Sequence, residues 1–146
     1  MNDQYRFDAV IHALPPSAAT ADCCPIEIQG EIVTTRAVDP TSLSTPFDCT
    51  FEEAGEKLEA TPRLYFEPDG SFVWTNPGCQ VDGILYDRND RLIYVEVHGN
   101  CPAAFFDQFL TILGWPATPL LFQLPRHAVF LDETAFRQFA SRRVSG

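Results

Sequence analysis

The stretch that decides the fold is residues 80–98, QVDGILYDRNDRLIYVEVH, in which apolar and polar side chains alternate on both sides of a short charged segment. Alternation with a period of two is typical of β-strands that are buried on one face. The charged segment Asp87–Arg91 separates two such runs. The stretch therefore predicts a β-hairpin with one buried face and one partly polar face.

The two predicted faces of this hairpin differ in chemical character, because successive side chains of a strand point to opposite sides of the sheet. The apolar face consists of Val81, Gly83, Leu85, Ile93, Val95 and Val97. The other face consists of Gln80, Asp82, Ile84, Tyr86, Leu92, Tyr94, Glu96 and His98. We expect the first face in the core and the second to carry polar groups at its base.

The length of the connecting loop sets which polar side chains of this hairpin meet. With a three-residue loop at 88–90, Asp82 pairs with Glu96 across the two strands, and Gln80 pairs with His98. With a loop of two or four residues, Asp82 and Glu96 lie on different faces of the sheet. Directly opposed carboxylates repel and persist most readily around a cation or a shared proton. Carboxylate and imidazole ligands suit Mg²⁺ or Mn²⁺. Asp82 and Glu96 are thus the candidate metal ligands, and His98 is expected in the same small area.

The N-terminal half of the chain is predicted to add strands and a helix. Tyr5–Ala13 alternates like a strand, Pro15–Pro25 has the composition of a loop, and Ile26–Val38 resembles a second strand that bends at Gly30. Thr50 and Glu53 have the spacing of a capping box, which predicts a helix up to Pro62. A first hairpin follows at Arg63–Thr75.

The C-terminal part is predicted to contain two helices around a short strand. Pro102 suits the first position of a helix that ends at Gly114. Leu120–Leu124 is short enough for a strand, Ala128–Leu131 extends it or adds another, and Asp132 caps a last helix. The expected fold class is α+β, with a mainly antiparallel or mixed sheet built from two hairpins and flanking strands and packed by two or three helices.

Composition restricts the classes of partner and compartment. The chain has 146 residues, 45% of them apolar, which predicts a single domain, 1–146. Ten Lys and Arg against twenty Asp and Glu give a net charge of -10, which disfavours nucleic acid and anionic lipid. This charge is compatible with a partner that has a basic surface, and equally with a solvated acidic surface that only keeps the chain soluble. No apolar run reaches membrane-spanning length. Five cysteines without a CxxC pair predict reduced thiols and a cytoplasmic location. His12 and His127 are expected at surface or rim positions.

The run Val81–Leu85 followed by Tyr94–His98 resembles the central motif of the PD-(D/E)xK nucleases, which have the restriction-endonuclease-like fold. That family has an Asp on one strand, Glu-x-Lys on the next, and then a helix and another strand. The resemblance implies that Asp82 and Glu96 hold a divalent metal and that His98 takes the place of the motif Lys. It therefore makes Asp82, Glu96 and His98 the candidate catalytic residues. It covers about half of the chain, from the helix at Thr50 to the strand at Leu124.

Two functions follow from these observations. The leading hypothesis is a non-catalytic protein-binding or accessory protein with no expected cofactor, because no complete catalytic set is evident and the chain is acidic. The alternative is a metal-dependent phosphodiesterase, or an inactivated relative, that uses Mg²⁺ or Mn²⁺ on Asp82 and Glu96 with Glu52 or Glu53 as a third carboxylate. Clustered Arg63, Arg88 and Arg91 would then be its only basic surface.

Overall fold

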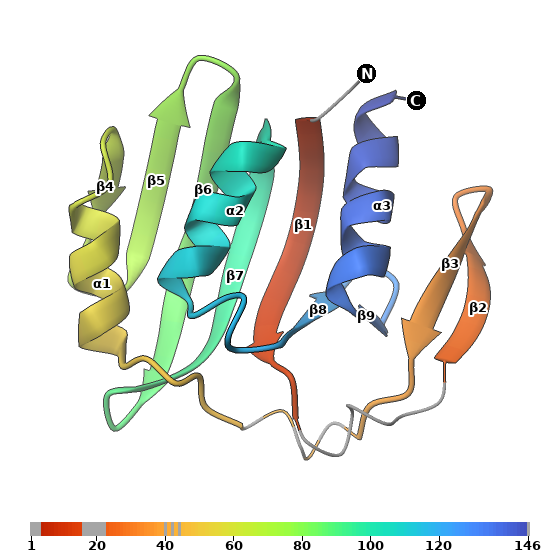
Figure 1. Ribbon diagram of the computed structural model, residues 1–146, viewed down its shortest axis with the longest axis horizontal. Coiled ribbons are helices and arrows are strands. Elements are labelled where there is room, and N and C mark those ends of the chain that lie inside the picture. The colour runs from red at the N-terminus through yellow and green to blue at the C-terminus, as the bar shows by residue number, and fades with distance from the viewer. Residues whose placement is uncertain (1–3, 16–22, 40, 42, 44, 146) are drawn as a thin grey trace.

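The computed structural model describes residues 4–15, 23–39, 41, 43 and 45–145, and its nine strands form one antiparallel sheet. The strand order is β2-β3-β9-β8-β1-β7-β6-β5-β4, which places β1 in the middle (Figure 1). The strands are β1 (Gln4–Ala13), β2 (Cys23–Ile28), β3 (Glu31–Arg36), β4 (Leu64–Phe66), β5 (Ser71–Asn76), β6 (Cys79–Arg88), β7 (Arg91–Pro102), β8 (Leu120–Leu124) and β9 (Val129–Leu131). The helices are α1 (Phe51–Glu59), α2 (Ala103–Ile112) and α3 (Glu133–Ser145).

The expected α+β class is wrong, because the fold is dominated by this single sheet and its three helices are short. The sequence interpretation missed part of the strand content. Ile26–Val38 does not form one bent strand but belongs to a β2–β3 hairpin, which turns at Gln29 and Gly30 with φ of 52° and 85°. Pro25 lies inside β2, where it is tolerated because β2 is an edge strand.

The three helices lie on one face of the sheet and leave the other face without a helix (Figure 1). An aromatic cluster beneath α2 and α3 joins the two layers: Phe122 of β8 stacks on Phe136 of α3 with ring centres 4.4 Å apart. Phe106 of α2 lies 5.7 Å from Phe136 and 5.2 Å from Phe7 of β1. Burial of these rings removes large apolar areas from water and fixes which sheet face is the core.

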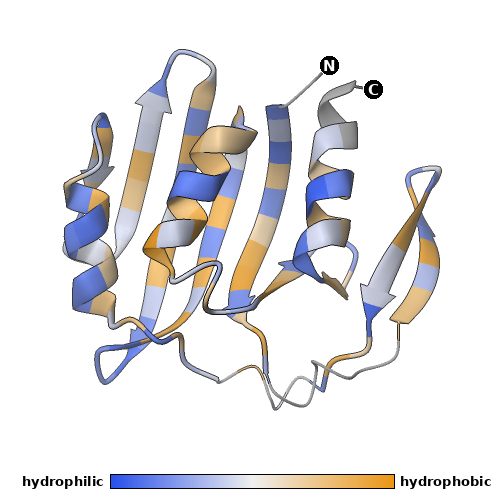
Figure 2. Cartoon of the chain, viewed as in Figure 1, coloured by the Kyte–Doolittle hydropathy of each residue, from blue (hydrophilic) through white to orange (hydrophobic). Residues whose placement is uncertain are grey.

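Several local predictions are confirmed. Both hydrogen bonds of the Thr50–Glu53 capping box are present at the start of α1. The side chain of Asp132 accepts a hydrogen bond from the Ala135 backbone N–H at 2.8 Å, as expected of a helix cap. Pro102 is the residue before α2 and not its first helical residue. Figure 2 shows that α2 is mainly hydrophobic, which suits a helix above the sheet centre, whereas α1 is mostly hydrophilic.

Gly99 of β7 is a position where the sheet requires glycine. Its φ is 134°, and a Cβ there would overlap the backbone carbonyl oxygen of Gln80 on β6. We therefore expect Gly99→Ala to lower the free energy of unfolding by about 3 kcal/mol or more, measured by chemical denaturation.

Gly78 provides the matched control for this substitution. It also has a positive φ, 77°, but nothing lies within 4 Å of a Cβ placed on it. Gly78→Ala should cost only the backbone strain, about 1 kcal/mol. Equal losses of stability in the two variants would contradict the β6–β7 packing described here.

Candidate functional site

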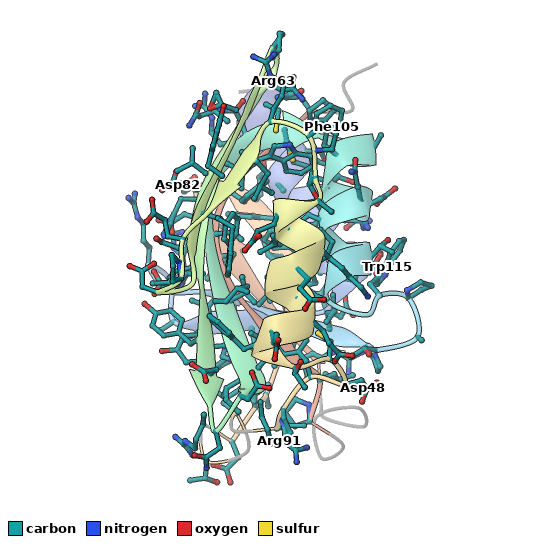
Figure 3. All side chains as sticks on the ribbon, turned by 90° about the vertical axis from the view of Figure 1, so that its left-hand side faces the viewer. Asp48, Arg63, Asp82, Arg91, Phe105 and Trp115 are labelled. Carbon is teal, nitrogen blue, oxygen red and sulfur yellow. The ribbon has the colours of Figure 1, made fainter. Side chains whose placement is uncertain are left out.

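The candidate residues lie on the face of the sheet that carries no helix. In Figure 3, Asp82 points to the side of the sheet opposite to α1, Phe105 and Trp115. Asp82 of β6 is exposed, and Glu96 and His98 of β7 are partly exposed. Strand alternation produces this separation, since Val81, Val95 and Val97 are buried on the other face.

The register of β6 and β7 differs from the register expected with a three-residue loop. Asp82 lies opposite His98, and Glu96 lies opposite Ile84. Asp82 and Glu96 are therefore diagonal neighbours, not a facing pair, although they do share one face. The predicted Gln80–His98 pair is also absent, because Gln80 pairs with Asn100.

A β-bulge explains both the new register and the shared face. The turn has only two central residues, Asn89 and Asp90, with φ of 53° and 65°, and Arg88 pairs with Arg91. The register then shifts by one residue between Tyr86 and Asp87. A two-residue loop alone would have moved Asp82 to the other face, but the bulge restores its position.

The bulge also exchanges two predicted side-chain positions. Leu92 is fully buried, whereas Ile93 is only partly buried and lines a hollow on the face without helices. The assignment of these two residues from strict alternation is therefore wrong. The assignments of the other residues in the hairpin hold, because they lie beyond the bulge.

One row of paired residues crosses five strands of this face. Tyr65 of β4 pairs with Val73 of β5, and Val73 pairs with Asp82 of β6. The row continues from Asp82 to His98 of β7 and then to Asp8 of β1. Because paired residues in a sheet have adjacent side chains on the same face, the row forms a continuous strip, which we call the Tyr65–Asp8 row.

His98 connects two carboxylates at one end of this row. Its Nδ1 lies 2.7 Å from Oδ1 of Asp8, and its Nε2 lies 3.4 Å from Oε1 of Glu96. Arg126 approaches the second oxygen of Asp8 at 3.1 Å. These side chains are between a third and four fifths exposed, so each pair is screened by water and contributes little to stability.

Glu96 has a second partner on β6. The hydroxyl of Tyr86 donates a hydrogen bond of 2.8 Å to Oε2 of Glu96, and the Tyr86 ring stacks on Tyr94 with centres 4.3 Å apart. The hydrogen bond to the carboxylate, together with burial and the negative charge of Glu96, raises the pKa of Tyr86. Asp82, in contrast, forms no hydrogen bond or ion pair with any described residue.

His12 lies further along the same face and is buried, which contradicts its expected surface position. Its Nε2 is 2.9 Å from Oε1 of Gln123, and burial lowers the pKa of the imidazole despite this hydrogen bond. His12 and Glu96 line a hollow of about 460 Å³ together with Tyr94 and Arg88. His127 is partly exposed, as its predicted rim position requires.

The other proposed participants do not gather here. Glu52 and Glu53 lie at the start of α1 on the helix side of the sheet, and Glu53 is engaged in the capping box. Arg63 and Arg91 lie at opposite ends of the molecule in Figure 3, so Arg63 does not join Arg88 and Arg91, which pair with each other. Within the described ranges, no group of three or more His, Cys, Asp and Glu side chains is placed to hold a metal ion.

Asp8 and Arg126 are parts of the site that sequence reasoning missed. Tyr5–Ala13 was predicted as a strand from its apolar odd-numbered residues, and Asp8 is one of the even-numbered residues between them, together with Arg6, Val10 and His12. Nothing in that pattern specifies that β1 pairs with β7, and the paired residues are more than 80 positions apart in the sequence. The one available signal was a carboxylate on the more polar, even-numbered side of this strand.

Comparisons of the chain with protein-family models, with curated proteins and with solved structures found no match. None of the helices in the described part of the chain is both long enough and apolar enough to cross a membrane.

The pKa of Tyr86 provides a test of the Glu96 contact. We expect Glu96→Gln to lower the Tyr86 pKa toward the ordinary value of about 10, because the negative charge that opposes phenolate formation is removed. The measurement is an NMR titration of ring-labelled tyrosine. Because the pKa of Tyr86 is higher in the folded protein than in the unfolded chain, the contact stabilises the fold fully at pH values below the unfolded-state pKa. This stabilisation is lost as the pH rises through the folded-state pKa.

Asp82→Asn is the control for this titration, because Asp82 shares the face but does not contact Tyr86. It should leave the Tyr86 pKa unchanged. The same Tyr86 pKa in the native chain and in Glu96→Gln would be inconsistent with the contact.

Proposed function

We propose that this chain is a non-catalytic protein-binding domain in which the β4–β7 part of the face without helices binds a basic surface of another protein. The observation that carries the proposal is the Tyr65–Asp8 row. Tyr65 is 71% exposed and Val73 is 41% exposed, and they lie side by side next to the unpaired carboxylate of Asp82. Exposed apolar side chains beside a free charge are typical of interaction surfaces.

The distribution of charge supports a basic partner. Residues 48–90 hold ten Asp and Glu against three Lys and Arg, so this segment carries most of the net charge of -10. The segment comprises α1, β4, β5 and β6, which lie together at one end of the sheet (Figure 1). A field of one sign speeds the association of an oppositely charged protein and orients it.

The chemistry of the row suits arginine and lysine side chains. The Tyr65 ring can pack against a guanidinium group, and the Asp82 carboxylate can accept its hydrogen bonds. Val73 between them supplies an apolar contact for the stems of such side chains. We place this function in the cytoplasm, because all five cysteines are free and a reducing compartment keeps them so.

The proposal is tested by capturing partners on the immobilised native chain and measuring the affinity of each purified partner. We expect a basic partner whose affinity falls as ionic strength rises. The double variant Tyr65→Ser with Asp82→Asn should weaken its binding by at least about tenfold. Partners of acidic character, or a basic partner bound equally well by the double variant, would contradict the proposal.

Ile32→Ser is the matched control for this experiment. Ile32 is 65% exposed, and it lies on β3 at the other end of the sheet. Its substitution removes a similar apolar area without touching the Tyr65–Asp8 row. Binding of the basic partner should therefore be retained in this variant.

A metal-dependent phosphodiesterase is the second candidate function, and one observation favours it. Asp82 and Glu96 share one face next to His98, and Asp8 adds a third carboxylate on the other side of His98. Carboxylate oxygens such as those of Asp82 and Glu96 are ligands of the type that Mg²⁺ or Mn²⁺ prefers, and an ion bound there would polarise a phosphoryl oxygen.

Calorimetric titration with Mn²⁺ separates the two candidates. If the phosphodiesterase candidate is correct, the native chain binds Mn²⁺ and Asp82→Asn binds it at least about tenfold more weakly. Asp69→Asn is a control of equal charge change, since Asp69 is exposed in the β4–β5 turn. Absence of Mn²⁺ binding, or equal binding in both variants, removes this candidate.

A further inference from the structure

The two edges of β1 are used unequally. Toward β7, β1 is paired at nine positions, Gln4 to His12. Toward β8 it is paired at only four positions, Val10 to Ala13, because β8 ends at Leu124 and the chain turns away there. The N-terminal half of β1 thus has an edge that no described strand occupies.

The hydrogen-bonding groups on this open edge belong to Arg6 and Asp8. The N–H of Leu14 bonds to the carbonyl of Pro119, so the even-numbered residues of β1 direct their N–H and C=O groups toward β8. The same alternation directs the groups of Arg6 and Asp8 to this side, beyond the end of β8. Neither backbone forms a hydrogen bond with any described residue across that edge.

A hollow of about 330 Å³ lies against this edge. Its apolar lining comes from Phe7 of β1, Leu124 of β8, and Phe136 and Phe139 of α3. This volume accommodates a large side chain. An unsatisfied strand edge beside an apolar hollow is the combination used in β-strand addition, where main-chain bonds give affinity and side-chain pockets give specificity.

The charge around the hollow is the reverse of the charge of the chain as a whole. Arg6 and Arg126 line it, against a single carboxylate, Asp8. Asp8 is already engaged with His98 at 2.7 Å and with Arg126 at 3.1 Å. The mouth of the hollow therefore complements an acidic ligand, in contrast to the acidic end of the sheet at α1.

We propose that the open edge of β1 binds an extended segment of a partner protein that carries a carboxylate next to a large apolar side chain. The segment continues the line of β8 and forms main-chain hydrogen bonds with Arg6 and Asp8. Its apolar side chain enters the hollow lined by Phe136 and Phe139, and its carboxylate pairs with Arg126. This site differs in place and chemistry from the surface at β4–β7 that we propose for a basic partner. Either proposal can therefore be contradicted by experiment while the other holds.

Hydrogen exchange of the free full-length chain tests the open edge first. The amides of Arg6 and Asp8 should exchange at least about a hundredfold faster than those of Phe7 and Ala9, which face β7. Equally slow exchange of all four amides at low protein concentration would overturn the proposal. Protection of Arg6 and Asp8 that increases with protein concentration would also overturn it, by assigning the edge to a second copy of the chain.

A displayed library of random nine-residue peptides then tests the ligand. We expect enrichment of peptides that join Asp or Glu to a large apolar residue, and the enriched peptides should slow exchange at Arg6 and Asp8 by at least about tenfold. Arg126→Glu should weaken their binding by at least about tenfold, since Arg126 is 79% exposed and the substitution leaves the core intact.

Arg88→Glu is the matched control, because it makes the same charge change at an exposed position in the β6–β7 turn. It should leave peptide binding unchanged. A library without enrichment, or peptides bound equally by Arg126→Glu and the native chain, would overturn the proposal.

Discussion

Packing of helices on only one face of a nine-stranded sheet is the constraint from which the rest of this structure follows. The rings of Phe7, Phe106, Phe122 and Phe136 fix which face is buried. Alternation along each strand then assigns every second side chain to the face without helices. Asp8, Asp82, Glu96 and His98 share this face although Asp8 comes from β1, which is distant in the sequence from the β6–β7 hairpin that carries the other three.

The central strand β1 links the two binding surfaces that we propose. On one side it pairs with β7 and places Asp8 beside His98 at the end of the Tyr65–Asp8 row. On the other side the early end of β8 leaves Arg6 and Asp8 without a strand neighbour. The chain thus has an acidic end formed by α1 and β4–β6 and a basic rim at the β1 edge, which suit partners of opposite charge.

The sequence predicted local elements well and long-range arrangement poorly. The capping box at Thr50 and the hairpin strands were recognised because their signals lie within a few residues. The Leu92–Ile93 exchange was missed because a bulge interrupts alternation without a sequence signature. The buried position of His12 and the contact of Asp8 with His98 depend on the pairing of β1 with β7 and β8, which no local pattern specifies.

The central claim is the β6–β7–β1 register that places Asp82, His98 and Asp8 in one row. Nuclear Overhauser contacts between backbone Hα protons test it most directly, because such protons approach closely at non-hydrogen-bonded antiparallel pairs. The register predicts contacts between Gly83 and Val97 and between Asp8 and His98. A contact between Gly83 and Val95 in place of Val97 would put Asp82 opposite Glu96 and contradict the account.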